Sequence, residues 1–255
     1  MRGMSGARAE EPRFTEDRLL GGQVRLRQPE EGYRVAIDPV FLAAAVPAEP
    51  GQVVLDAGCG AGAAMLCLAA RVSSCRVIGV ELQRDLVRLA GDNIILNGLE
   101  TRLSVMLGDL LRPPPRLAFG AFDHVMANPP FNPRERTLAP PGAGRAAATT
   151  EGEADLAAWV QFALAMARAK GTVTFIHRAD RIDALLKEIA GRAGEVVIFP
   201  LWAGAGRPAS RVLVRARKQV AAPARIAPGL VLHEPDGRYT AAAEAVLREG
   251  AGLDL

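Results

Sequence analysis

The residues best suited to chemistry are the consecutive Asn128, Pro129, Pro130 and Phe131. The prolines stiffen the backbone and remove two N–H donors, so carbonyl oxygens stay available as acceptors. The Asn128 amide oxygen and the Pro129 carbonyl can accept both N–H bonds of an aromatic or amide amino group. Such a group is a poor nucleophile, and these acceptors stabilise the charge that develops on its nitrogen during alkylation. Phe131 would stack on the flat substrate, which contributes about 1–3 kcal/mol for a nucleic acid base.

A second cluster alternates an acid and three glycines with other residues, at Asp56, Gly58, Gly60 and Gly62. Glycines at such a turn let the backbone bend sharply and let a ligand lie against bare peptide. The N-terminus of the helix expected to follow offers unpaired N–H groups. Nicotinamide dinucleotide folds use the spacing G-x-G-x-x-G, whereas the third glycine here comes one residue earlier. The pattern indicates a ligand-binding turn between a strand and a helix, with a plain tight turn as the alternative.

Two further acids follow the next two expected strands. Glu81 stands 25 residues after Asp56, close to the spacing at which an acid accepts hydrogen bonds from ribose hydroxyls. A solvated loop carboxylate is the alternative for Glu81. Asp109 follows the third strand and is a further candidate for a ligand-binding acid. An ordinary turn aspartate is the alternative for Asp109.

Alternating strands and helices must position these residues. We expect strands at 53–57, 76–81, 103–107, 122–127, 172–176, 195–199 and 211–217, and helices at 63–71, 84–96, 156–169 and 182–190. This alternation predicts right-handed βαβ units and a mostly parallel sheet. Each candidate residue then lies at the carboxyl end of a strand, which is the ligand-binding edge of such a sheet.

The flanking segments are expected to be smaller. Residues 1–17 are polar and lack periodicity, which predicts a disordered tail. One domain is expected over 18–255, with an N-terminal extension (18–50) and a short C-terminal appendage (219–255). The extension contains a short strand at 23–27 and a helix at 40–46, which Pro39 opens. The appendage contains a strand at 230–233 and a helix at 241–248.

Together these motifs resemble the amino-methylating branch of class I S-adenosylmethionine methyltransferases. Segments 33–42, 207–212 and 232–240 make the chain more closely similar to bacterial tRNA adenine-N6 methyltransferases, which act next to the anticodon of valine tRNA. The resemblance extends over residues 18–250. It implies an α/β, Rossmann-like, seven-stranded, mostly parallel sheet with an antiparallel last strand and helices on both faces. It also implies that S-adenosylmethionine is the cofactor, bound by Asp56, Gly58, Gly60, Gly62, Glu81, Asp109 and Asn128.

The activity that this resemblance implies is methyl transfer to the N6 amine of an adenine in tRNA. An RNA loop suits such a site because single-stranded bases can splay out and stack on an aromatic ring. Phe131, Arg134 and Arg145 are the expected substrate contacts, and Arg136 could also meet phosphate. The small-residue insert 137–153 predicts a mobile loop, either a lid that contacts RNA or a spacer.

Other functions stay open from the sequence. The release-factor glutamine methyltransferases share the Asn-Pro-Pro-aromatic motif but carry a helical N-terminal domain, whereas only a short segment precedes residue 53 here. Guanine-N2 rRNA methyltransferases usually carry a duplicated domain, and DNA adenine methylation lacks a visible DNA-reading domain. A non-enzymatic module that binds the cofactor or RNA is disfavoured by the intact Asn128, Pro129 and Phe131. The glycine spacing disfavours a nicotinamide-dependent oxidoreductase.

Composition narrows these possibilities only slightly. The chain has 255 residues, 49% hydrophobic, with a formal net charge of +3, which is compatible with an anionic partner. Three cysteines without a C-x-x-C pair argue against a zinc site, and no metal is expected. The polar N-terminus is no signal peptide, so a cytoplasmic protein is expected. Asp38 could lie near a ligand or could cap the helix that begins at Pro39.

Overall fold

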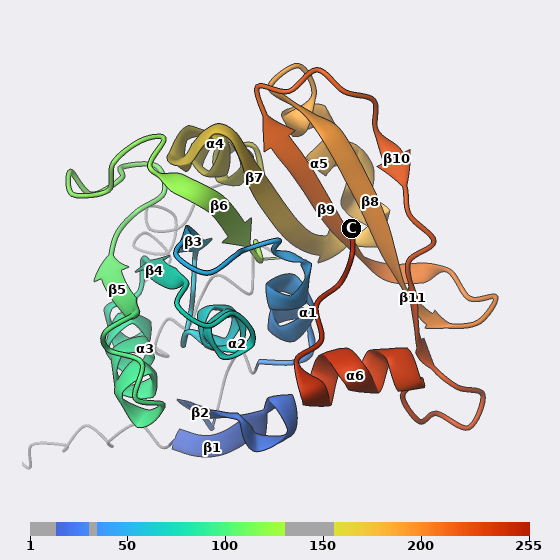
Figure 1. The fold of residues 1–255 in the computed structure, drawn as a ribbon, viewed down its shortest axis with the longest axis horizontal. Coiled ribbons are helices and arrows are strands. Elements are labelled where there is room, and N and C mark those ends of the chain that lie inside the picture. Colours follow the sequence, from blue (N-terminus) through green and yellow to red (C-terminus); the bar gives the residue numbers. More distant parts are fainter. Residues whose placement is uncertain (1–13, 31–34, 131–155) are drawn as a thin grey trace, which may run out of the picture.

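The computed structural model describes residues 14–30, 35–130 and 156–255, and a nine-stranded sheet forms its centre (Figure 1). The strand order is β10-β8-β9-β7-β6-β3-β4-β5, and β11 also pairs with β8. These strands are β3 (Val53–Ala57), β4 (Arg76–Glu81), β5 (Leu103–Leu107), β6 (Phe122–Ala127), β7 (Ala167–Arg178), β8 (Ala193–Gly204), β9 (Ala209–Lys218), β10 (Arg225–Ile226) and β11 (Leu230–His233).

The central part of this sheet confirms the expected seven strands, in the order β5-β4-β3-β6-β7-β9-β8. Strands β3 to β7 pair in parallel, and β9 runs antiparallel between β7 and β8. Central residues such as Val54, Leu55 and Val125 are fully buried, because helices cover both faces of a parallel sheet. Beyond the seven expected strands, β10 and β11 extend the sheet along β8.

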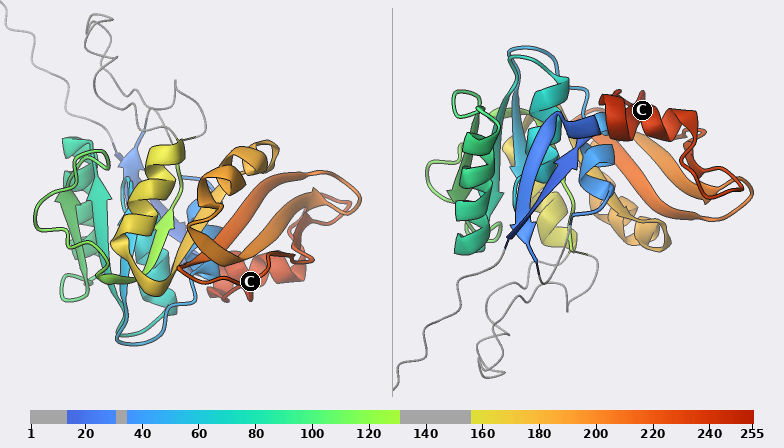
Figure 2. Two further views of the ribbon diagram at one scale, coloured as in Figure 1. Left: turned by 90° about the horizontal axis from the view of Figure 1, so that it is seen from above. Right: turned by 90° about the horizontal axis from the view of Figure 1, so that it is seen from below.

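Helices cover both faces, as expected (Figure 2). One hydrophobic core forms under α1 (Asp38–Ala45), α2 (Ala63–Arg71) and α3 (Arg84–Leu96). A second core forms on the opposite face under α4 (Leu156–Met166) and α5 (Ile182–Ile189). None of the described helices is long and apolar enough to span a membrane.

The N-terminal region differs from the prediction of a disordered tail over residues 1–17. Residues Phe14–Leu19 form β1, which pairs antiparallel with β2 (Val24–Pro29) after the 3-10 turn η1 (Leu20–Gly22). The prediction is therefore wrong for residues 14–17, while residues 1–13 lie outside the described part. The physical reason is that β2 buries Val24 and Leu26 in the core, and β1 gains a partner ladder that its own polar sequence does not reveal.

The helix expected at 156–169 is also shorter than predicted. It ends at Met166, and β7 begins at Ala167, which pairs with Phe122 of β6. The Ala167 carbonyl accepts a hydrogen bond from the Lys218 side chain at 2.8 Å. These contacts with other strands outweigh the helical propensity of the alanine-rich sequence.

The C-terminal residues pack onto the domain. Helix α6 (Ala241–Glu249) is capped by Thr240, whose hydroxyl accepts from the Ala243 N–H at 3.2 Å, and it packs against α1 and η1. The Leu253 N–H donates to the Ala44 carbonyl of α1 at 2.8 Å. The C-terminal strand and helix expected from the sequence are thus confirmed and contribute to the core around α1.

Candidate functional site

The glycine loop joins β3 to α2 at the carboxyl edge of the sheet. The N–H groups of Gly58 and Cys59 both donate to the Val80 carbonyl, at 2.8 and 3.1 Å, which ties the loop to the end of β4. Gly58 and Gly60 have φ values of 67° and 56°, a region that side chains with a Cβ rarely adopt. A Cβ at Gly58 would lie 2.3 Å from the Trp159 ring, whereas a Cβ at Gly60 would meet no described atom within 4 Å. The Trp159 ring therefore packs against the loop at Gly58, whereas the loop is open at Gly60.

Asp56 is the buried acid of this loop, with an exposed fraction of 2%. Burial, reinforced by the charge of Glu81, raises the pKa of the Asp56 carboxyl to about 8, although the Met65 backbone N–H lowers it. Asp56 Oδ2 is buried and has no hydrogen-bond partner among the described residues. Such an atom has lost its water without a replacement partner, which is the arrangement expected where a ligand group completes the site.

Glu81 lies at the end of β4 and supports the same loop. Its Oε2 accepts from the Gly60 N–H at 3.0 Å, and its Oε1 accepts from the Gln83 N–H at 2.9 Å. Burial raises the pKa of the Glu81 carboxyl, while these N–H donors oppose the rise. Each carboxylate oxygen can accept more than one hydrogen bond, so Glu81 can hold the loop and still accept from a ligand hydroxyl.

Asp109 follows β5 at the same edge and is half-buried. Its Oδ1 accepts from the Leu111 N–H at 2.9 Å, which is the local turn contact foreseen as the alternative for this residue. The Gly108 N–H donates to the Glu81 carbonyl at 2.9 Å, which fixes the position of this turn beside the end of β4.

Asn128 stands directly after β6, next to the glycine loop. The β3–β6 register pairs Ala57 with Ala127, so Asn128 and Gly58 leave neighbouring strands at the same level. Asn128 Oδ1 is buried and has no partner among the described residues. Pro129 is buried and Pro130 half-buried, whereas the predicted substrate contacts Phe131, Arg134 and Arg145 lie outside the described residues, as does the insert 137–153.

Trp159 of α4 is a site residue that the sequence reasoning missed. Its ring lies against Gly58, and its Nε1 is buried without a hydrogen-bond partner among the described residues. A buried indole N–H usually finds an acceptor. An aromatic residue in the first helix after the Asn-Pro-Pro motif could have drawn attention to this position, but only the fold brings it to the glycine loop.

Asp38 does not cap a helix in the way that the sequence suggested. It is the first residue of α1, where the N-cap residue is Ile37, whose side chain makes no capping hydrogen bond. Asp38 is buried, and its Oδ2 accepts from Arg211 Nε of β9 at 2.9 Å. Nearby, burial lowers the pKa of His177 to about 4, and the charges of Arg181 and Arg211 contribute. The register of β7 with β6 and β9 places this polar group at the same edge as Asn128.

This chain matches known proteins of similar sequence over part of its length. It is 27% identical over 138 residues to an rRNA N(6)-adenosine-methyltransferase of Caenorhabditis elegans, covering 54% of this chain and 56% of that protein. It is 30% identical over 100 residues to a tRNA1(Val) (adenine(37)-N6)-methyltransferase of Shewanella halifaxensis, and the match covers 39% of this chain and 40% of that protein. The matches thus span about half the length of these curated relatives, or less.

Solved structures agree on the fold. A predicted O-methyltransferase of Agrobacterium tumefaciens superimposes with a TM-score of 0.71 at 22% identity, covering 85% of this chain and 98% of that one. A SAM-dependent O-methyltransferase of Thermotoga maritima gives a TM-score of 0.54 at 16% identity, and the superposition covers 76% of this chain and 69% of that one. The fold is therefore the Rossmann-like methyltransferase fold.

The family match includes the candidate site. Residues 39–183, more than half of the chain, match the family described as N-6 DNA methylase. This range contains the glycine loop, Glu81, Asp109 and the Asn-Pro-Pro motif. The chain therefore belongs to the N-6 DNA methylase family.

Proposed function

We propose that this protein transfers a methyl group from S-adenosylmethionine to the N6 amine of an adenine in RNA, with tRNA as the preferred substrate. The observation that carries this proposal is the Asn128 amide oxygen, which is buried and unpartnered among the described residues, beside the open glycine loop. A buried acceptor without a donor costs about 1–3 kcal/mol. A substrate that supplies the donor would remove this cost, which favours its binding.

The residues at this edge fit S-adenosylmethionine, the methyl donor of this family. That donor supplies a methyl group on a positively charged sulfonium. Gly60 leaves its backbone open to a ligand, and Glu81 has lone pairs available for ribose hydroxyls. Asp56 offers an acceptor with no described partner. Asp109 uses Oδ1 for its local turn and would accept from the adenine amino group of the donor with its remaining lone pairs.

The chemistry at the acceptor follows from Asn128 and Pro129. Asn128 Oδ1 and the Pro129 carbonyl would accept the two N–H bonds of the adenine amine. Positive charge develops on that nitrogen as it is methylated, and acceptors already in place stabilise this charge without reorganisation. Holding the amine in line with the methyl group lowers the entropic part of the barrier. Phe131 would stack on the adenine ring.

The relatives support RNA over DNA, although the family description names DNA. The curated enzymes above are named for adenine N6 in rRNA and in tRNA1(Val). The identity is 30% over 100 residues to the tRNA enzyme and 27% over 138 residues to the rRNA enzyme, so tRNA is the first candidate substrate by identity and rRNA the second. We further propose that one methyltransferase domain, expected over residues 18–255 and beginning with β1 at Phe14, acts in the cytoplasm.

The test uses the purified protein, labelled S-adenosylmethionine, and tRNA, rRNA and genomic DNA from a strain that lacks the enzyme. Products are digested to nucleosides and separated. We expect label in N6-methyladenosine from tRNA, and its loss in Asn128→Ala.

Label from rRNA alone would change the substrate to rRNA, and label from DNA alone would reject an RNA enzyme. In a parallel reaction with release factor as the substrate, label in glutamine would move the assignment to the release-factor type. Cofactor binding without transfer to any of these would favour a binding module.

A further inference from the structure

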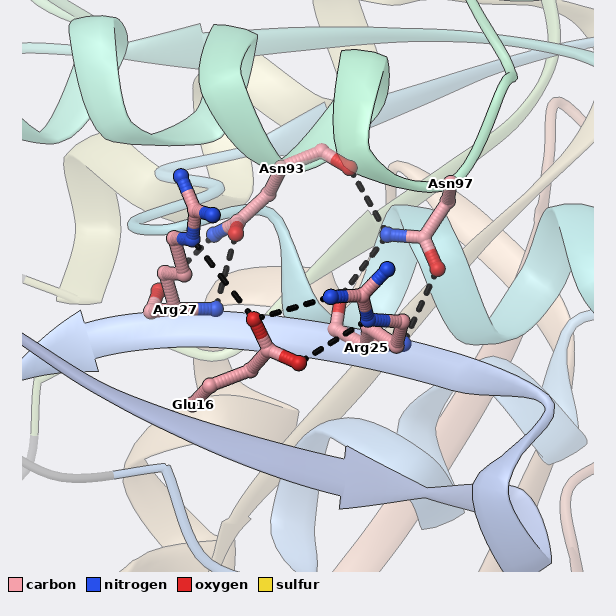
Figure 3. A network of polar contacts seen from close by, with 5 residues as sticks. All are labelled: Glu16, Arg25, Arg27, Asn93 and Asn97. Atoms are coloured by element: carbon pink, nitrogen blue, oxygen red, sulfur yellow. Dashed lines mark hydrogen bonds and ion pairs between the residues drawn. The ribbon is translucent and has the colours of Figure 1, made fainter.

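Two asparagine side chains of the α3 region bond to the main chain of β2 (Figure 3). Asn93 accepts from the Arg27 N–H at 2.8 Å and donates to the Arg27 carbonyl at 2.8 Å. Asn97 accepts from the Arg25 N–H at 2.9 Å and donates to the Arg25 carbonyl at 2.7 Å. The two amides thus pair with alternate residues of β2, as a neighbouring strand would. They are four residues apart, about 6 Å along a helix, close to the roughly 6.8 Å between alternate strand residues.

The two asparagines differ in their remaining hydrogen bond. Asn93 Nδ2 also donates to the Ala61 carbonyl of the glycine loop at 2.9 Å, and Asn93 is fully buried. Asn97 Nδ2 donates instead to the Asn93 carbonyl within the helix at 2.7 Å. Asn93 therefore connects the β1–β2 hairpin to the glycine loop, whereas Asn97 contacts the hairpin without reaching the loop.

The loop is consequently held at two adjacent residues. Glu81 holds the Gly60 N–H at 3.0 Å, and Asn93 holds the Ala61 carbonyl. Ala61 is 7% exposed, so water has little access to replace a lost donor. A buried carbonyl without a donor is unfavourable, and the loop would shift to expose it. Such a shift moves the peptide at Gly60, where the loop is open.

We propose that Asn93 is a positioning residue for the cofactor loop, acting through the Ala61 carbonyl and tying the loop to the N-terminal hairpin. This inference rests on the proposed function, because it assigns the loop to S-adenosylmethionine. Loss of the Asn93 amide weakens cofactor binding without removing any group that touches the reacting atoms. The effect therefore falls on the KM for S-adenosylmethionine and leaves kcat unchanged.

The experiment compares Asn93→Ala, Asn93→Asp and Asn97→Ala in the full chain. Asn97→Ala is the matched control, because it removes the same kind of contact to β2 and leaves Ala61 bonded. Asn93→Asp retains the side-chain volume and an acceptor for the Arg27 N–H but faces the Ala61 and Arg27 carbonyls with an oxygen, and it serves if the cavity left by alanine prevents folding. Binding of S-adenosylmethionine is measured by calorimetry, and hydrogen exchange at residues 60–62 is measured without cofactor.

We expect both Asn93 variants to raise the Kd for S-adenosylmethionine by about tenfold, the size of one well-placed hydrogen bond. They should also accelerate exchange at residues 60–62, while Asn97→Ala changes neither quantity. Equal effects of Asn93 and Asn97 variants on both quantities, or no effect of the Asn93 variants, would overturn the inference. Failure of the unmodified protein to bind S-adenosylmethionine would instead reject the proposed function, and with it the cofactor role of Asn93.

Discussion

Asp38 and Arg211 are 173 residues apart in the chain and form an ion pair, with Arg211 Nε 2.9 Å from Asp38 Oδ2. The Asp38 side chain is 9% exposed and that of Arg211 32%, so the pair is only partly screened by water. It connects the first helix of the domain to the antiparallel strand β9 at the edge that holds Asn128.

Removing the Asp38 charge should destabilise the protein measurably. We expect Asp38→Asn to lower the free energy of unfolding by about 1.5–3 kcal/mol, typical of a hydrogen bond between charged groups. Chemical denaturation measures this change. The exposed pair of Arg248 and Glu244 within α6 is the control, and Glu244→Gln should cost only about 0.3–0.5 kcal/mol. A loss at Asp38 no larger than that at Glu244 would contradict the assigned importance of this pair.

Alanine at Gly58 and at Gly60 should separate folding from binding. Both positions have positive φ, which costs a side chain about 1–2 kcal/mol. Gly58→Ala also forces its methyl group against the Trp159 ring and should lower the melting temperature further. Gly60→Ala meets no described atom, so it should melt higher than Gly58→Ala yet lose affinity for S-adenosylmethionine. Calorimetry and thermal melts measure both, and full affinity in Gly60→Ala would show that the ligand does not approach this peptide.

Asn128→Ala should lower kcat without lowering stability. Its amide oxygen is buried and has no partner among the described residues, so truncation removes no hydrogen bond between that oxygen and those residues. Losing one preorganised group of this type costs about 10²–10³ in kcat. We expect a melting temperature equal to or above that of the unmodified protein. A large loss of stability together with normal kcat would assign Asn128 a structural role only.

Asp56 should make stability depend on pH. The pKa of its carboxyl is raised from 3.8 to about 8, so between these values the folded protein holds a proton that the unfolded chain has released. Stability from this group therefore falls as pH rises from about 4 through about 8. Asp56→Asn should flatten that part of the profile, which denaturation at several pH values would measure.

The same shift predicts the pH dependence of cofactor binding. A cationic ligand favours the ionised carboxylate, so its binding releases a proton from Asp56 below pH 8. Affinity for S-adenosylmethionine should then rise as pH approaches about 8, and Asp56→Asn should remove this rise. Affinity that is independent of pH in the unmodified protein would indicate that Asp56 does not face the cation.

The sequence by itself determined the local units of the site. The bounds expected for β3, α2, β4, α3, β5 and β6 agree with the structure, and Asp56, Glu81, Asp109 and Asn128 all lie at or just beyond the expected strand ends. Apolar runs punctuated by glycine and proline carry this information within a few residues, because strand burial and turn geometry are local in sequence. Parallel pairing then necessarily brings the strand ends to one edge.

Only the tertiary structure decided which distant residues support that edge. Trp159 against Gly58, Asp38 with Arg211 and Asn93 with Ala61 join segments far apart in the chain, and so does the contact of the β1–β2 hairpin with α3 through Asn93 and Arg27. No periodicity marks these partners, because each contact is made by single side chains that the fold brings together. A polar strand such as β1 and an asparagine inside α3 are therefore unremarkable in sequence, and they acquire their roles from the neighbours that the fold supplies.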